Sequence, residues 1–250
     1  MTRRTCAFLF IRRRVHAGAL VALAALGLAA ACLFPGCSGT VSPWDFKKDE
    51  PPPPPFTLPR TSPENVLYNF RAIYDGADYF VETEADTLQW GGMYRALFHP
   101  DSFKFYFLPG DQSLEYPDGW WGVAEEVASF ENLLLHKVSG VVQGISLSWT
   151  VNPSEPDNRP NPEALSQLLH PTWRRIYVTG ILLDVYEGEI DHRVANATAD
   201  FYFAPDPANS TLWVITEWFD RQPVGGSPPS RVSAAQGSST TWGRIKQLYH

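Results

Sequence analysis

Apolar residues repeat at intervals of three and four along the first part of the globular sequence. This spacing predicts a helix over Ser62–Gly76. Ser62 is suited to the N-cap and Pro63 to the first turn. The apolar face of this helix is formed by Val66, Leu67, Phe70, Ile73 and Tyr74. The same spacing predicts a helix over Gly122–His136. The stretch Asp78–Phe98 is expected to be helical in two pieces, because Gly91–Gly92 interrupts the pattern.

Further along the chain the period changes from about three and a half to two. In Ile145–Val151 apolar residues alternate with serine and threonine, as in a strand with one buried face. Aromatic and β-branched stretches predict further strands at 103–108, 174–186, 193–204 and 212–220. Polar turns are expected at 187–189 and 205–209, and the proline-rich segment 152–162 is expected to be a loop.

Helices followed by long strands joined by hairpins predict an α+β fold. Residues 62–250 suffice for a single domain with its own core. Within it, 224–240 is rich in Gly, Ser and Pro and is expected to be mobile. The closing segment Trp242–Tyr249 can place Trp242, Ile245 and Tyr249 on one helical face.

The N-terminal segment has the pattern of an export signal. Five arginines come first, Ala17–Phe34 carries no charge, and Pro35 and Gly36 end the apolar run directly before Cys37. This arrangement resembles the lipobox of bacterial lipoproteins, which implies a signal peptide at 1–36 and lipidation of Cys37. Acylation at Cys32 and an uncleaved membrane helix remain alternatives, since the run reaches the lower limit of spanning length.

The segment after this signal indicates how the domain is attached to the membrane. Residues 37–61 form a polar, proline-rich tether with five consecutive prolines at 51–55. Cleavage removes five arginines and no acidic residue, so the net charge changes from −7 to −12. This charge argues against nucleic acid as a partner and leaves the acyl chains as the link to the membrane. The expected location is therefore the bacterial cell envelope, outside the cytoplasm.

The residue inventory gives little support for metal or cofactor chemistry. All three cysteines lie in or directly after the signal, so the mature chain has neither a disulfide framework nor a thiolate metal site. The histidines do not follow zinc-binding spacings, and glycine-rich phosphate loops and nucleophile elbows are missing from the sequence. We therefore expect no metal and no cofactor.

Several stretches resemble the nuclear transport factor 2-like family, a cone-shaped α+β fold with helices packed on a curved antiparallel sheet. They are Tyr74–Asp78, Leu97–Asp101, Phe103–Phe107 and Trp213–Phe219, and the resemblance covers roughly residues 62–220. The family includes isomerases, dehydratases and cyclases as well as binding and dimerising domains, so fold alone does not decide function. We expect an aromatic cavity used for binding an apolar small molecule or for protein assembly, including a homodimer, and no catalysis.

The alternative is a cofactor-free isomerase or lyase that uses tyrosines and carboxylates of the cavity. Its candidate residues are Glu217, Tyr68, Tyr106 and His99, although the resemblance gives no complete catalytic dyad. Alternation predicts that Glu217 shares a cavity face with Trp213 and Ile215, opposite the face of Phe103, Phe105 and Phe107. Otherwise Glu217 is expected to form a cross-strand ion pair with an arginine such as Arg174 or Arg193, and Asp200 is expected to face solvent.

Overall fold

The computed structural model describes residues 58–111, 116–188, 190–221 and 241–250, all within the unit Pro51–His250. The predicted signal peptide, Cys37 and nearly all of the tether lie outside these residues, as does the segment 224–240. In the part of the chain that is described, no helix is both long enough and apolar enough to cross a membrane.

The predicted helices are present, with small shifts at their ends. They are α2 (Pro63–Phe80), α3 (Glu84–Arg95), α4 (Val123–Val138) and the short α5 (Trp242–Leu248). Ser62 caps α2 as predicted, since its hydroxyl accepts the backbone N–H of Asn65 at 3.2 Å. Because α2 continues one turn beyond Gly76, its buried side extends to Ala77.

The prediction that Gly91–Gly92 interrupts the second helix is wrong, because both residues lie inside α3. A side chain at Gly91 would lie 2.1 Å from the Glu131 carboxylate of α4, so the missing Cβ permits close contact between the two helices. Gly76 of α2 likewise leaves room for the Trp90 ring of α3. These glycines therefore serve helix packing rather than helix termination.

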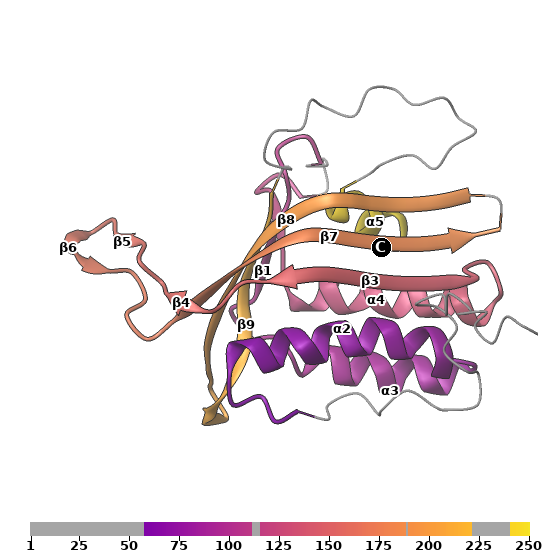
Figure 1. The fold of residues 1–250 in the computed structure, drawn as a ribbon, viewed down its shortest axis with the longest axis horizontal. Helices are drawn as coiled ribbons and strands as arrows, with labels where there is room; N and C mark the ends of the chain where they lie inside the picture. Colours follow the sequence, from indigo (N-terminus) through magenta and orange to yellow (C-terminus); the bar gives the residue numbers. More distant parts are fainter. Residues whose placement is uncertain (1–57, 112–115, 189, 222–240) are drawn as a thin grey trace, which may run out of the picture. The chain divides into compact units, whose positions relative to one another are not determined.

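The strands form one mixed, mostly antiparallel sheet and a small separate ribbon. The strands are β1 (Lys104–Tyr106), β2 (Trp120–Trp121), β3 (Gly144–Val151), β4 (Glu155–Pro156), β5 (Pro160–Asn161), β6 (Ala164–Leu168), β7 (Arg174–Glu187), β8 (Ile190–Asp206) and β9 (Asn209–Arg221). The sheet order is β2-β1-β9-β8-β7-β3, with β4 paired to β7. Only the β1–β9 pairing is parallel among these strands. Figure 1 shows α2 and α3 running side by side next to the sheet. The α+β prediction is confirmed.

The segment 152–162, predicted to be a loop, contributes to an arm. Strands β5 and β6 pair with each other and project away from the sheet, connected to it through β4 (Figure 1). We call residues 153–173 the arm. It is connected to the sheet through the pairing of β4 with β7, in which Glu155 and Pro156 lie opposite Arg175 and Arg174.

The sheet has an inner face, which packs on the helices, and an outer face on the opposite side. Phe70 of α2 contacts the rings of Phe201 in β8 and Trp218 in β9, so these two side chains define the inner face. The β8–β9 register shifts between Tyr202 and Phe203. A shift of this kind interrupts strict alternation, because an extra residue on one strand changes which side chains share a face.

Candidate functional site

Aromatic side chains fill the space between the helices and the inner face. Phe70 alone lies within 6.3 Å, centroid to centroid, of the rings of Tyr74, Tyr94, Phe98, Trp149, Phe201, Trp218 and Trp242. A cavity of about 10 Å³ remains beside Tyr74, Lys246 and Tyr249. That volume is near the minimum for a single water molecule, so this cavity has no room for an organic ligand in the observed arrangement.

A charged group lies in this aromatic interior. Helix α5 inserts Lys246, whose amine contacts the carboxylate of Glu126 in α4, and both side chains are at most 4% exposed. Glu126 also accepts the Tyr94 hydroxyl at 2.6 Å and the Trp121 indole N–H at 3.0 Å. We call the following set the Lys246 cluster: Lys246, Glu126, Tyr94, Trp121, Phe105 and Trp218.

Burial changes the proton affinity of this cluster. Burial lowers the pKa of Lys246 to about 8, although the nearby Glu126 carboxylate opposes this effect. Burial first, and then the charge of Glu126, raises the pKa of Tyr94 well above its ordinary value. A lysine with a lowered pKa is a familiar acid–base group. In this cluster, however, the Lys246 amine, the Tyr94 hydroxyl and the Trp121 indole all bind the Glu126 carboxylate.

A second buried acid lies at the start of α5. Asp220 of β9 accepts the backbone N–H of Gly243 at 3.3 Å and is 5% exposed. Burial is the main reason that its pKa rises to about 7, with a further contribution from Asp111. Asp111 is paired with Arg244 of α5 at 3.3 Å. The charge state of Asp220 therefore affects how well α5 is held.

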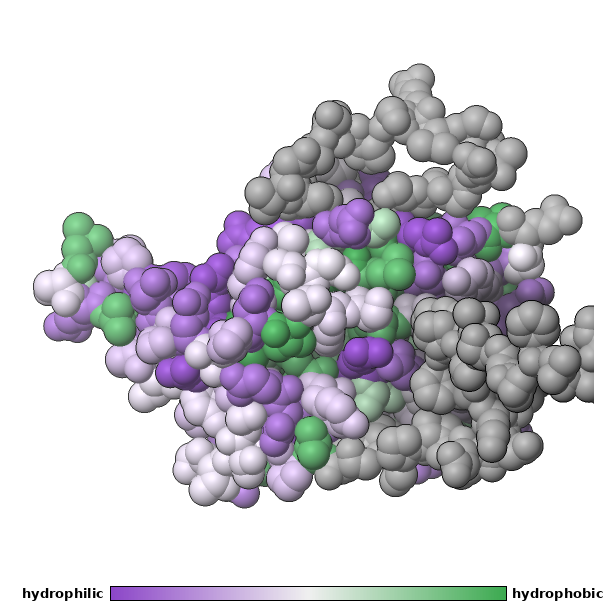
Figure 2. All heavy atoms as spheres, viewed as in Figure 1, coloured by the Kyte–Doolittle hydropathy of each residue, from purple (hydrophilic) through white to green (hydrophobic). Residues whose placement is uncertain are grey.

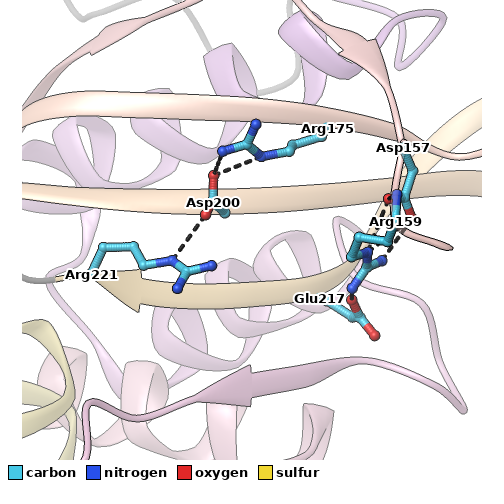
Figure 3. A network of polar contacts seen from close by, with 6 residues as sticks. All are labelled: Asp157, Arg159, Arg175, Asp200, Glu217 and Arg221. Carbon is cyan, nitrogen blue, oxygen red and sulfur yellow. Dashed lines mark hydrogen bonds and ion pairs between the residues drawn. The ribbon is translucent and has the colours of Figure 1, made fainter. Parts of the chain in front are cut away.

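The outer face carries a different set of charges, shown in Figure 3. Asp200 of β8 accepts hydrogen bonds from Arg175 at 2.8 Å and from Arg221 at 2.9 Å. Asp200 is 3% exposed, so the expectation that it faces solvent is wrong, because two arginines cover it. Arg159 of the arm bonds to Asp157 and reaches Glu217 of β9 at 2.5 Å.

These ion pairs surround aromatic rings on the same face. The Arg159 guanidinium lies 3.7 Å from the centre of the Tyr202 ring, and the rings of Tyr106 and Phe219 stack at 4.2 Å. Burial alone would lower the pKa of Arg159, but its bonds to Asp157 and Glu217 outweigh that effect and raise it. Arg159 therefore remains charged and ties the arm to the sheet.

The structure does not bring the predicted candidate residues into one interior site. Glu217 lies on the outer face with Arg159, because the register shift directs both Ile215 and Trp218 inward and Glu217 outward. The expected shared cavity face of Glu217 and Ile215 is therefore wrong, and Glu217 pairs with Arg159 rather than with Arg174 or Arg193. Phe105 does meet β9 on the inner face, but through Trp218, at 4.9 Å.

The other three candidates, Tyr106, Tyr68 and His99, do not form a site with one another in the interior. Tyr106 lies on the outer face, where burial and then the charge of Glu217 raise its pKa. Tyr68 is 48% exposed on α2. His99 caps a turn, with its Nδ1 accepting the backbone N–H groups of Asp101 and Ser102, each at 3.2 Å.

Sequence reasoning did not find the Lys246 cluster. A signal was present, since Lys246 is next to Ile245 in the predicted closing helix and three residues before Tyr249. Glu126 lies one position before Val127 on the apolar side of α4. In the sequence alone, a lysine or a glutamate at such a position is expected to face water. Only the folded structure shows that Lys246 and Glu126 meet in the interior. Among the described residues, no group of three or more His, Cys, Asp or Glu side chains is placed to hold a metal ion.

The order of elements agrees with the α+β arrangement that the sequence resemblance implied, with helices preceding long antiparallel strands. The structure is similar to a nuclear transport factor 2-like superfamily protein from Salmonella enterica subsp. enterica serovar Typhimurium str. LT2. The two chains are 12% identical, with a TM-score of 0.35, over 71% of this chain and 100% of that one.

It is also similar to a domain of unknown function with a cystatin-like fold from Nostoc punctiforme PCC 73102. Here the identity is 12% and the TM-score 0.33, over 64% of this chain and 78% of that one. No protein-family model and no curated protein matches the sequence. The fold class therefore rests on the topology itself, and the comparisons add nothing about activity.

Proposed function

We propose that this is a lipid-anchored domain of the bacterial cell envelope that acts by binding another protein, without catalysis. The observation that carries the proposal is the filled interior, in which aromatic rings and the Lys246 cluster pack together and the cavity beside Tyr74 has no room for an organic ligand. A domain of this kind offers its surface for binding. The acyl group on Cys37 would keep that surface at the membrane.

The arm is the surface best suited to contact a partner. Leu165 and Leu168 on β6 are 78% and 43% exposed, and Figure 2 shows apolar residues at the end of the arm. The ion pair of Arg159 with Glu217 of β9 fixes the other end of the arm to the outer face, and Asp157 holds the Arg159 side chain within the arm. Exposed apolar side chains on a protruding, fixed element favour protein contact.

Site-specific photo-crosslinking in the intact membrane tests the assembly role. A photoreactive amino acid in place of Leu165 should give a protein adduct of defined mass. The matched control is the same substitution at Leu88, which is 69% exposed on α3 and lies outside the arm. Equal adducts at both positions, or none at Leu165, would contradict contact through the arm.

The anchor is tested separately. Cys37→Ser should move the protein from the membrane fraction to the soluble fraction, because the thiol that carries the lipid is lost. Cys32→Ser is the control and should leave the distribution unchanged. Membrane retention of Cys37→Ser with an intact N-terminus would favour the uncleaved helix, and release of Cys32→Ser would favour acylation there.

The alternative roles require an accessible interior. A cofactor-free isomerase or lyase needs a carboxylate beside bound substrate, whereas Glu126 already bonds to Tyr94, Trp121 and Lys246. An apolar ligand that co-purifies with the tagless protein and is identified by mass spectrometry would favour small-molecule binding over assembly.

A further inference from the structure

The Lys246 amine is surrounded in the way that proteins recognise organic cations. Its Nζ lies 3.6 Å from the ring centre of Trp218 and 3.8 Å from that of Phe105, with Trp121 at 5.9 Å. A cation within about 6 Å of an aromatic centre is attracted to the ring face, and more strongly where water is excluded. The carboxylate of Glu126 completes the enclosure by accepting a hydrogen bond from the amine.

The parts of this enclosure come from separate elements, while its cation comes from α5. Phe105 lies on β1, Trp121 on β2, Trp218 on β9 and Glu126 on α4. Two donors, the Tyr94 hydroxyl and the Trp121 indole, orient the carboxylate independently of Lys246. The receiving groups are therefore held in place without the lysine, as in a preformed binding site.

We infer that the Lys246 cluster is a binding site for a primary alkylammonium group, which Lys246 fills as an internal ligand and for which an external amine competes. The distances define the ligand class. At 3.6–3.8 Å from two ring centres, Nζ leaves no space for N-methyl groups, which would themselves need that separation from the rings. A primary amine also supplies the N–H that Glu126 accepts.

Two features of the docked helix favour such competition. The indole N–H of Trp242 is buried without a hydrogen-bond partner among the described residues, which weakens the docked arrangement. Asp220, a buried acid near Asp111 and Lys246, accepts the backbone N–H of Gly243, so part of the contact that holds α5 depends on a charge that is costly to bury. This inference concerns the interior alone, so it can fail without affecting the assembly role proposed for the arm.

The site itself is tested in the full chain by Lys246→Ala. Alanine retains Cβ, so n-propylammonium has the shape of the missing three carbons and nitrogen. At about ten times its Kd, this ion should raise the Tm of the variant by about 3–6 °C, and 1-propanol and tetramethylammonium should not. Glu126→Gln combined with Lys246→Ala is the matched control, which should lose the preference for the cation.

If Lys246→Ala does not fold alone, the measurement becomes recovery of the folded state during refolding with each compound. Recovery with n-propylammonium only would support the site. Equal effects of 1-propanol and n-propylammonium, or no effect of either, would overturn it.

Competition is tested in the wild-type chain by hydrogen exchange. A free 1,5-diamine or a lysine-containing peptide should speed exchange of the α5 amides severalfold relative to sodium chloride of equal ionic strength, while α3 amides stay unchanged. A response to the diamine alone identifies a small-molecule amine, and a response to the peptide alone identifies a lysine side chain of a protein. Unchanged α5 exchange with both would overturn the competition.

Discussion

The two charged regions of this domain each centre on a buried carboxylate, but they differ in how exposed its cationic partner is. In the interior, one ammonium meets one carboxylate, with Lys246 4% and Glu126 1% exposed. On the outer face, Asp200 binds Arg175 and Arg221, whose side chains are 28% and 51% exposed. Removing Glu126 leaves Lys246 without the carboxylate it contacts, whereas Asp200 keeps one arginine if the other is removed.

The difference shows why burial, more than the number of ion pairs, sets the importance of a charge. A buried ion pair gains little over apolar packing, but removing one partner leaves an uncompensated charge in a medium of low polarity. An exposed pair is screened by water and salt and contributes little. The mutations below test this contrast, from the largest expected effect to the smallest.

Glu126→Ala should have the largest effect. It leaves the Lys246 amine without its carboxylate and the Tyr94 hydroxyl without its acceptor, so the free energy of unfolding should fall by about 3–5 kcal/mol. Chemical denaturation measures the loss. Adding Lys246→Met should recover part of it, because no buried charge remains. A loss below about 1 kcal/mol would mean that α5 leaves the interior readily and lets Lys246 reach water.

Asp220→Asn should change how stability depends on pH. The pKa of Asp220 is raised to about 7 in the folded protein from 3.8, so the folded state holds this proton more tightly than the unfolded state does. Its stabilising contribution is therefore full below about pH 4 and is lost as the pH rises through about 7.

The stability difference between wild type and Asp220→Asn should therefore shift by about 2–4 kcal/mol in favour of wild type between pH 8 and pH 4. Denaturation of both proteins at each pH measures this shift, and the shared effects of other acids cancel in the comparison. A constant difference would show that Asp220 ionises normally.

Glu217→Gln should have a smaller effect, about 1 kcal/mol, because the ion pair with Arg159 is partly exposed and Arg159 keeps Asp157. We expect the loss to concentrate at the arm, seen as faster limited proteolysis of residues 153–173. The control is Glu163→Gln, which lies on the arm itself and forms no ion pair with the sheet among the described residues. Unchanged proteolysis with impaired ligand binding would favour a functional role for Glu217.

Arg221→Ala should have the smallest effect, at most about 0.5–1 kcal/mol, because Arg175 continues to pair with Asp200. The effect should decline further in 0.5 M salt, since the Arg221 side chain is 51% exposed. A loss comparable to that of Glu126→Ala would remove the contrast between the two regions.

Local patterns in the sequence predicted most elements but not their relations. Helical spacing of apolar residues predicted α2 and α4. The capping residue Ser62 and the following Pro63 correctly predicted where α2 begins. The Gly91–Gly92 error arose because glycine usually weakens helices, whereas here Gly91 makes room for Glu131. That reason lies on another helix and cannot be read locally.

The candidate site was harder to predict for the same reason. The β8–β9 register shift between Tyr202 and Phe203 separates Glu217 from Ile215, and alternation along one strand contains no sign of it. Lys246 and Glu126 are separated by most of the domain in sequence, so their pairing depends on the completed fold.

The parallel pairing of β1 with β9 also determines when this domain can fold. Lys104 lies opposite Glu217, although more than a hundred residues separate them. During synthesis α2, α3 and α4 are made before β8 and β9. Until those strands are present, the apolar faces of the three helices are exposed to water. Distant contacts of this kind slow folding. We therefore expect slow, all-or-none folding once β9 is available, and a need for protection from aggregation until then.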